Sequence, residues 1–240
     1  MSPDIRQHRG AHPGDKTLFD EKQLPVLRTS VEELSWLLSR GYSMKASVKL
    51  VGDKYALTER QRMAIARAGC SDESLAARES SRQLIEGITG ENIIVDGFNL
   101  IITVEAALSH GVLLLCRDDC IRDLSSVHGS YRAVKETETA IRLIGEALEN
   151  LKPKTVEWAL DKPISNSGRL AKRIRELASD RDWPWTVELL FNPDNHILSA
   201  NRIAIASDSV VLDRVPRWVN FKRELIETRL ADSWLIDLRS

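Results

Sequence analysis

The sequence predicts an α/β protein in which a parallel sheet flanked by helices follows a small all-α module. Three observations support this prediction. The apolar run at residues 93–95 stops abruptly at Asp96 and Gly97, strand-like and helix-like segments alternate after it, and residues 24–88 have helical periodicity. Strands separated by helices need crossover connections, which favour a parallel sheet.

Composition and charge are those of an ordinary globular protein. Of the 240 residues, 42% are hydrophobic and 29% are charged, and the formal net charge is −1. Three cysteines do not indicate a disulfide framework in a chain of this size, and no apolar run approaches the roughly 20 residues of a membrane span. Because the start of the chain also lacks a signal-peptide pattern, we expect a cytoplasmic protein without membrane contact.

The chain divides into three predicted segments. Residues 1–23 are polar and lack periodicity, which predicts a loosely held N-terminal arm. Residues 24–88 form the helical module, a candidate for nucleic-acid binding, and residues 89–240 form the α/β domain.

Capping signals place the helices of the module, because a side chain that accepts from the first turn marks where a helix begins. The expected caps are Ser30 with Glu33, Thr58 with Gln61, and Ser71. Helices are expected at 30–41, 43–51, 58–69 and 71–87.

Basic residues outnumber acidic ones between residues 40 and 67. Arg60 and Arg67, seven residues apart, fall on one side of the helix expected there. We interpret them as a face that could follow the phosphates of a nucleic acid, beside an acidic pocket. The alternatives are pairing with acids of the next domain and simple exposure to water.

In the α/β domain, apolar β-branched runs predict strands and amphipathic stretches predict helices. Strands are expected at 93–96, 155–161, 186–191, 202–207 and 234–238, with a strand or a buried turn at 111–116. Helices are expected at 100–109, from about 132 to 151, at 169–178 and from about 220 to 229.

Four of these strands end in an acid: Asp96, Asp161, Asp194 and Asp208. Because the carboxyl ends of parallel strands share one edge of a sheet, these carboxylates are expected to converge. Asn99 follows Asp96 closely enough to point its amide into the same crevice. The alternative is that the acids are helix caps and surface residues.

Clustered carboxylates repel unless a cation lies between them, and a hard divalent cation such as Mg²⁺ or Mn²⁺ prefers oxygen ligands. We expect Asp96, Asp161 and Asp208 to bind this metal or to position a water, and Asn99 to orient Asp96 or to contact substrate. Asp194 and Asp213 are second candidates for the metal site.

The motif V-D-G-F-N at 95–99 resembles the first motif of the PIN-like nucleases, particularly the NYN branch, in which Asp-Gly-Tyr-Asn ends the first strand. A-L-D at 159–161 and A-S-D-S at 206–209 resemble the second-strand aspartate and the late S-D signature of that branch. The resemblance covers roughly residues 91–238. It implies a PIN-like sheet and a Mg²⁺- or Mn²⁺-dependent ribonuclease with Asp96, Asp161 and Asp208 at the metal.

Two departures accompany this resemblance. Val210 stands where the late motif has a second aspartate, with Asp213 as a doubtful substitute, and the connection between the first two motifs is long. The whole chain also resembles an uncharacterised prokaryotic family that joins a helical module to such a domain, a likeness that brings no activity with it.

The long connection is rich in residues that bind phosphate. We expect its arginines to contact substrate and its histidine to protonate a leaving oxygen, with an internal salt-bridge network as the alternative. These residues are Arg117, Arg122, Arg132 and His128. Arg169, near an expected helix start, is a further candidate phosphate ligand or part of a simple turn. Zinc binding by Cys116 and Cys120 is a poor match to structural zinc sites.

The sequence therefore predicts a metal-dependent phosphodiesterase that cleaves RNA, with DNA as an alternative substrate and with a homodimer compatible with the chain. One rival is an inactive PIN-like protein that binds RNA or acts as a scaffold. A nucleotide-binding or phosphate-transfer enzyme is a second rival, and the absence of its glycine-rich phosphate motifs argues against it.

Overall fold

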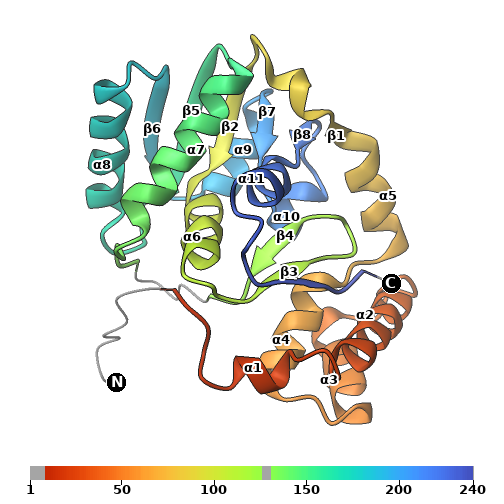
Figure 1. The fold of residues 1–240 in the computed structure, drawn as a ribbon. Helices are drawn as coiled ribbons and strands as arrows, with labels where there is room; N and C mark the ends of the chain where they lie inside the picture. Colours follow the sequence, from red (N-terminus) through yellow and green to blue (C-terminus); the bar gives the residue numbers. More distant parts are fainter. Residues whose placement is uncertain (1–8, 126–130, 240) are drawn as a thin grey trace.

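A computed structural model describes residues 9–125 and 131–239 and confirms the α/β class, with helices flanking a parallel sheet. The sheet has six strands in the order β1-β8-β7-β2-β5-β6, and every neighbouring pair is parallel (Figure 1). The strands are β1 (Arg82–Gln83), β2 (Asn92–Asp96), β5 (Thr155–Asp161), β6 (Trp185–Leu190), β7 (Ile203–Ile205) and β8 (Trp218–Val219).

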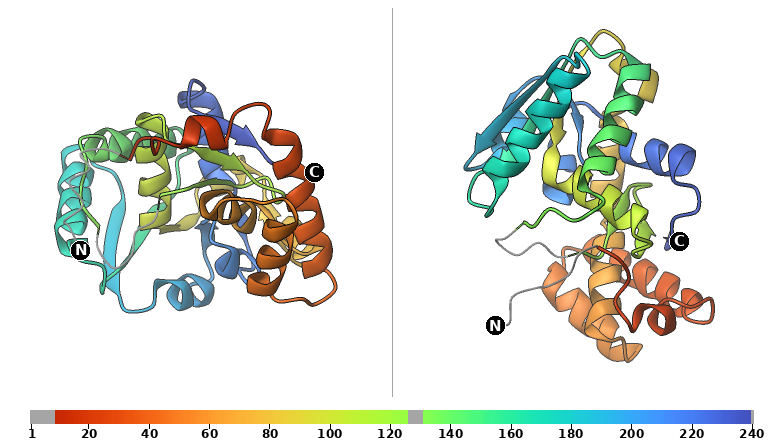
Figure 2. Two further views of the ribbon diagram at one scale, coloured as in Figure 1. Left: turned by 90° about the horizontal axis from the view of Figure 1, so that it is seen from below. Right: turned by 60° about the vertical axis from the view of Figure 1, so that its left-hand side comes forward.

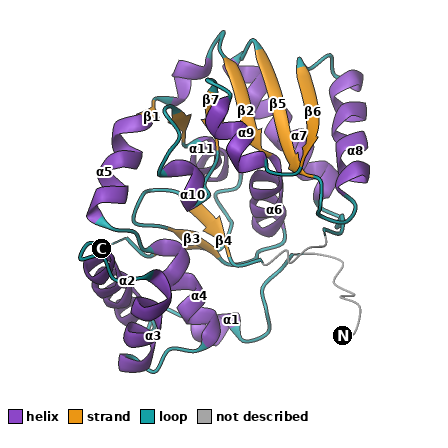
Figure 3. Cartoon of the chain, turned by 180° about the vertical axis from the view of Figure 1, so that it is seen from behind, coloured by secondary structure: helices purple, strands orange, loops and turns teal. Residues whose placement is uncertain are grey.

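Helices cover both faces of this sheet. On β2, Ile93 and Val95 enter one apolar core and Ile94 enters another, as expected for a strand buried on both sides. The first core is completed by α6 (Gly97–Leu108), α7 (Thr137–Leu151), α8 (Ser167–Asp180) and α11 (Phe221–Arg229). The second is completed by α9 (Pro193–Ser199) and α10 (Ser209–Leu212), which face the viewer in Figure 3.

The N-terminal part of the chain is helical, as expected. The predicted capping box is present, since Thr58 and Gln61 each accept a backbone N–H from the other, and Ser71 caps the helix that follows it. The helices are α1 (Asp15–Leu18), α2 (Leu24–Leu38), α3 (Met44–Lys54), α4 (Glu59–Ala68) and α5 (Asp72–Ser81), followed by the short 3-10 helix η1 (Ile85–Ile88).

The expected cap at Ser30 is wrong. Helix α2 begins six residues earlier, with Pro25 in its first turn, and Ser30 lies buried in its interior. There the Ser30 hydroxyl donates to the Val26 carbonyl, while Glu33 pairs with Lys54 instead of capping the helix. A hydroxyl in mid-helix can bond the carbonyl four residues earlier, so the spacing of a capping box alone does not fix a helix start.

A second sheet lies between the large sheet and the helical module (Figures 1 and 2). Its order is β4-β3-β9, with β3 antiparallel to β4 and parallel to β9. One face packs on α6 and α11, and the other face shares a core with α2, α3 and α4. The strands are β3 (Leu113–Leu115), β4 (Ile121–Asp123) and β9 (Leu235–Asp237).

Several short elements differ from expectation. The last strand, β9, joins the small sheet instead of the large one, and residues 209–212, just beyond the strand expected at 202–207, form the short helix α10. Helix α5 ends at Ser81, well before Gly87, because the chain then adds the two-residue strand β1 to the sheet edge. Two-residue strands carry too little sequence pattern to be predicted.

The described part of the N-terminal arm is held by ion pairs. Arg9 pairs with the fully buried Glu105 of α6, and Asp15, also fully buried, pairs with Arg60 of α4. None of the helices that the structure describes is long and apolar enough to cross a membrane.

Candidate functional site

The candidate site lies at the carboxyl ends of the central strands. Strand β2 is flanked by β5 on one side and by β7 on the other, so the strand order reverses beside β2. Open α/β sheets place ligands in the crevice at such a switch point. Asp96 ends β2 and is aligned with Ala159, two residues before Asp161 at the end of β5.

Four carboxylates line one cavity of about 240 Å³ at this edge. Three of them were expected to converge from separate strand ends, and the fourth, Asp123, comes from β4 of the small sheet. The four residues are Asp96, Asp123, Asp161 and Asp194. The cavity also contains Arg67 and Asn99, so both the helical module and the α/β domain contribute to its wall.

Asp96 is the most deeply buried of the three strand-end acids in this cavity. Its Oδ2 accepts a 2.5 Å hydrogen bond from Asn99 Nδ2, which places the amide where the sequence predicted it. Burial raises the pKa of Asp96 to about 6, although the Asn99 hydrogen bond and the charge of Lys222 act in the opposite direction. The negative charges of Asp208 and Asp194 add to the increase.

The other strand-end acids also act on one another. Burial raises the pKa of Asp161, and burial together with the charges of Asp208 and Asp161 raises the pKa of Asp194. Like charges raise each other's pKa only when they lie close together. The acids of four different segments therefore share one electrostatic environment.

Asp208 lines an adjoining cavity of about 270 Å³, which shares Arg67, Asn99 and Asp123 with the first. Its Oδ1 accepts backbone N–H groups of Val210 and Val211 at 2.8 and 3.3 Å, so Asp208 is the N-cap of α10. Asp208 thus has the structural role that was the alternative for these acids, and it also faces the site.

A buried lysine, missed by the sequence analysis, lines this adjoining cavity. The ammonium of Lys222 donates to Asn99 O at 3.0 Å, to Thr103 Oγ1 at 2.9 Å and to Ser207 Oγ at 2.6 Å. Burial lowers its pKa to about 8, against the opposing charges of Asp123 and Asp96. Lys222 looks like an ordinary surface position at the start of an amphipathic helix, so no local pattern could have revealed its burial.

Asp123 was also missed, although the sequence analysis singled out the segment that contains it. Its Oδ2 accepts from Thr103 Oγ1 at 2.7 Å, and its Oδ1 accepts from the backbone N–H of Ser125 at 2.8 Å. Strand β4 places this carboxylate between α6 and Arg67 of α4. The density of charged residues at 117–123 was a valid signal, but it did not indicate which acid reaches the site.

The two arginines expected on the module's basic face have different environments. Arg67 lines both cavities and donates to the carbonyl oxygens of Asp123 (2.5 Å) and Ser125 (3.5 Å). Arg60 instead pairs with Asp15, a carboxylate of the N-terminal arm. Only Arg67 therefore lies where a substrate phosphate next to the carboxylates would be within reach.

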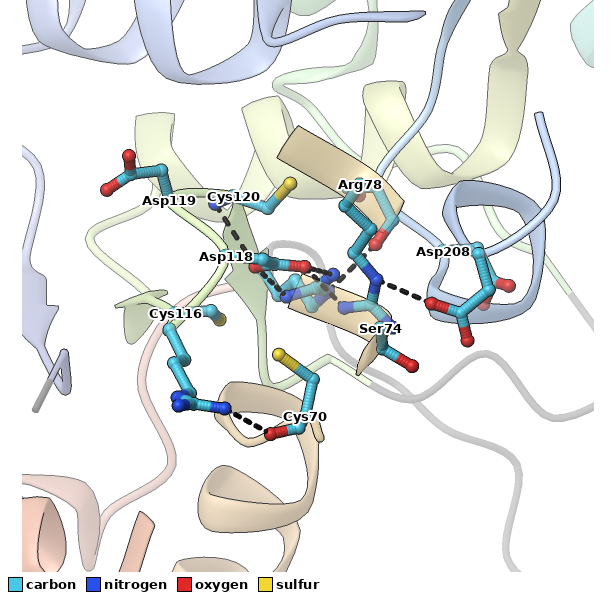
Figure 4. A network of polar contacts seen from close by, with 12 residues as sticks. Cys70, Ser74, Arg78, Cys116, Asp118, Asp119, Cys120 and Asp208 are labelled. Carbon is cyan, nitrogen blue, oxygen red and sulfur yellow. Dashed lines mark hydrogen bonds and ion pairs between the residues drawn. The ribbon is translucent and has the colours of Figure 1, made fainter. Parts of the chain in front are cut away.

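A buried ion-pair network is centred on Asp118 and Arg78, which Figure 4 labels, and it includes Arg122 and Asp213. Asp118 accepts from Arg122 at 2.8 and 2.6 Å and from Arg78 at 2.6 Å, and Arg78 also pairs with Asp213 at 2.7 Å. Burial acts to raise the pKa of Asp118, but the two guanidinium groups outweigh it and lower the pKa to about 2. The network joins α5, the β3–β4 hairpin and α10.

This network engages two residues that were expected at the site. Arg122 was expected to hold phosphate. It lines the adjoining cavity, but its guanidinium donates to Asp118 and to the carbonyl oxygens of Ser207 and Arg67. Asp213 was expected as a reserve metal ligand, but it is ion-paired to Arg78 and is not among the described residues that line the two cavities. A salt-bridge network was the alternative for Arg122, whereas the pairing of Asp213 with Arg78 was not among the alternatives.

The remaining predicted substrate residues lie outside the two cavities. Arg117 donates to Cys70 O and pairs with Asp72, and Arg132 and Arg169 are exposed. None of these three is among the described residues that line the cavities. His128 lies outside the described residues.

The side chains fit a hard divalent cation better than zinc. Carboxylate and amide oxygens are the ligands that Mg²⁺ and Mn²⁺ prefer. Among the described residues no three Asp, Glu, His or Cys side chains form a ready-made metal site. Mg²⁺ usually keeps several waters and is bound through one or two carboxylates plus substrate phosphates, so such an ion would not need three protein ligands here.

Zinc at the cysteines does not fit, because a zinc ligand must be a thiolate. Cys116 and Cys120 are both buried, and burial raises the pKa of both thiols, that of Cys116 to about 11.

Comparison with known proteins gives a family but no activity. Residues 26–80 match the family described as "Protein of unknown function (DUF434)", a segment within α2 to α5. The chain is 31% identical over 198 residues to "Uncharacterized protein MJ0935" of Methanocaldococcus jannaschii, an alignment covering 82% of this chain and 94% of that protein. No solved structure matches the chain. Residues 85–224, more than half of the chain and including all of the strand-end acids, match "Domain of unknown function (DUF5616)", and the protein belongs to this family.

Proposed function

We propose that this protein is a metal-dependent phosphodiesterase that cleaves RNA at the acidic cavity. The observation that carries the proposal is the gathering of Asp96, Asp161 and Asp194 from three strand ends into one cavity, with Asp208 alongside. The resemblance of the segments around Asp96, Asp161 and Asp208 to NYN-type PIN-like motifs supports the same activity. RNA as substrate also fits the cytoplasmic location that we propose from the cysteine content.

Each residue then has a defined task. Asp96, Asp161 and Asp208 would hold Mg²⁺ or Mn²⁺, with Asp194 as a further oxygen donor. Asn99 orients Asp96 by donating to its Oδ2. The bound cation would stabilise the negative charge that develops on the phosphodiester during attack by water. Arg67 lies in the same cavity and would contact a phosphate oxygen of the substrate.

A rival function is RNA binding without cleavage. It is favoured by the absence of a ready-made group of three metal donors among the described residues, and by the use of one Asp208 oxygen as a helix cap. The two functions differ in whether the carboxylates hold a metal ion that supports cleavage of the RNA.

Thermal unfolding with and without Mn²⁺ tests the metal site. Mn²⁺ should raise the melting temperature of the wild type and of Asp232→Asn, an exposed acid elsewhere, but not that of Asp96→Asn. Equal stabilisation of wild type and Asp96→Asn would show that Asp96 does not bind the metal.

RNA cleavage tests the activity. Incubation of labelled structured and unstructured RNAs with Mn²⁺ should give cleavage that Asp208→Asn abolishes. RNA that is bound but not cut by the wild type would favour the scaffold function.

The two arginines of α4 provide a matched pair for substrate contact. Arg67→Gln should weaken RNA binding, whereas Arg60→Gln should leave binding unchanged and lower stability, because it leaves the buried Asp15 without its partner. Equal RNA affinities of wild type and Arg67→Gln would exclude Arg67 from the substrate site.

A further inference from the structure

The segments that follow β5 and β6 border the acidic cavity, and each carries one large side chain close to an acid. The loop after β5 carries Lys162 next to Asp161, and the loop after β6 carries Phe191 three residues before Asp194. A 2.7 Å hydrogen bond from the Lys162 N–H to the Leu190 carbonyl joins the two loops. Asp161 at the end of β5 and Asp194 in the first turn of α9 line the cavity, whereas Lys162 and Phe191, close to them in sequence, lie outside its lining.

Phe191 is an unusually exposed aromatic residue. Its exposed fraction is 75%, and the ammonium of Lys162 lies 4.6 Å from the centroid of its ring. A single exposed apolar residue needs no explanation. An aromatic face paired with a cation, however, is the combination that binds a nucleotide, since the ring stacks on a base and the ammonium attracts a phosphate.

The cavity also has an apolar wall beside these loops. Ile164, two residues after Lys162, and Pro193, two residues after Phe191, both line the cavity together with Phe98 and Ile102. Carboxylates alone would suit a phosphate-bound metal, whereas an apolar wall suits the sugar or base next to that phosphate. The segments after β5 and β6 thus give the cavity both carboxylates and apolar surface.

We infer that Phe191 and Lys162 form a subsite for an unpaired nucleotide next to the phosphodiester held at the acidic cavity. The inference rests on the proposed function and specifies its substrate as single-stranded nucleic acid. A base can lie on the Phe191 ring only if it has left its own stack, so a continuous duplex cannot occupy the subsite.

Binding to short fluorescent RNAs tests this subsite. The probes are an unstructured 12-nucleotide strand, its duplex, and a series of strands with one abasic position moved along the chain, all in EDTA and again with Ca²⁺. Stacking of a base on one aromatic side chain predicts a loss of about 5- to 150-fold in single-strand affinity for Phe191→Ala. Phe191→Trp should keep this affinity, and Lys162→Gln should reduce it less than Phe191→Ala does.

The abasic series gives the sharper result. In the wild type one abasic position should weaken binding far more than the others, and Phe191→Ala should remove this difference. Leu84→Ala, which alters an exposed residue elsewhere (81% exposed), should behave as wild type. The inference is overturned if Phe191→Ala changes single-strand and duplex affinity alike, or changes neither, or if the wild type binds no single strand.

Failure of this inference is distinguishable from failure of the proposed function. If the wild type shows the position-dependent binding but Mn²⁺ produces no cleavage, the subsite stands and the enzymatic function is wrong. If the wild type cleaves RNA and Phe191→Ala cleaves single strands and duplexes with unchanged efficiency, the enzyme stands and the subsite is wrong.

Discussion

Lys222 Nζ donates a 2.6 Å hydrogen bond to the Oγ of Ser207, the residue that precedes Asp208. The same ammonium donates to Asn99 O and Thr103 Oγ1 of α6. One buried cation therefore joins the two sides of the crevice between β2 and β7. It also provides positive charge beside a group of carboxylates that would otherwise repel one another.

The pH dependence of stability should report the burial of Lys222. Because burial lowers its pKa from the usual 10.5 to about 8, the unfolded chain holds this proton more strongly than the folded protein does between these values. The loss of stability caused by burying the charged Lys222 is complete below about pH 8 and disappears as pH rises toward 10.5. Urea unfolding should show that wild type gains stability relative to Lys222→Met over this interval. If the difference in free energy of unfolding between the two proteins does not change with pH, the lowered pKa of Lys222 is contradicted.

Asp96 should produce the opposite dependence at acidic pH. Its pKa is raised from 3.8 to about 6, so the folded protein loses stability as pH rises between these values. Without divalent ions, Asp96→Asn should therefore be more stable than wild type above about pH 6, by up to about 3 kcal/mol, and the difference should narrow toward pH 4. Chemical denaturation at several pH values measures this, and a less stable Asp96→Asn at neutral pH would disprove it.

Asp118 should be among the most sensitive polar positions. Asp118→Asn leaves the buried Arg78 and Arg122 without their shared carboxylate, and breaking a buried pair in this way costs about 3–5 kcal/mol. The control is Asp72→Asn, which breaks a pair with Arg117 at a carboxylate that is 73% exposed and should change stability far less. Similar losses for both variants in urea unfolding would contradict the burial of the network.

Two glycines provide a packing test. A Cβ at Gly145 of α7 would lie 2.0 Å from the ring of Trp183, which is itself stacked on Trp185, so Gly145→Ala should destabilise by about 1–3 kcal/mol or more. A Cβ at Gly168 of α8 meets nothing within 4 Å, so Gly168→Ala should stay within about 1 kcal/mol of wild type. Thermal unfolding of the two variants should separate them clearly, and equal melting temperatures would contradict the close approach at Gly145.

Long, strongly patterned segments were predictable from sequence. β2 and β5 are apolar runs that end in an acid, and the capping box at Thr58 marks the start of α4. These features depend on neighbouring residues alone, so the sequence records them directly. The meeting of Asp96 and Asp161 at one edge followed from the parallel sheet.

The rest of the site depends on contacts between distant segments. Asp123 and Lys222 reach the crevice because a β-hairpin and the helix α11 pack against α6, and no local pattern describes that packing. Asp213 has the sequence features of a metal ligand but is paired with Arg78, a residue of a different module. Partners distant in sequence thus decided which charged residues lie at the site.

The core shared by the first helices and the last strand has a consequence for biosynthesis. Leu27, Val31 and Leu34 of α2 pack in the same apolar cluster as Ile236 and Leu238, and Arg28 donates to the carbonyl of Asp237. Arg28 and Asp237 are 209 residues apart, so on the ribosome α2 is synthesised long before these partners. Part of the apolar surface of α2 therefore stays uncovered until β9 has been synthesised.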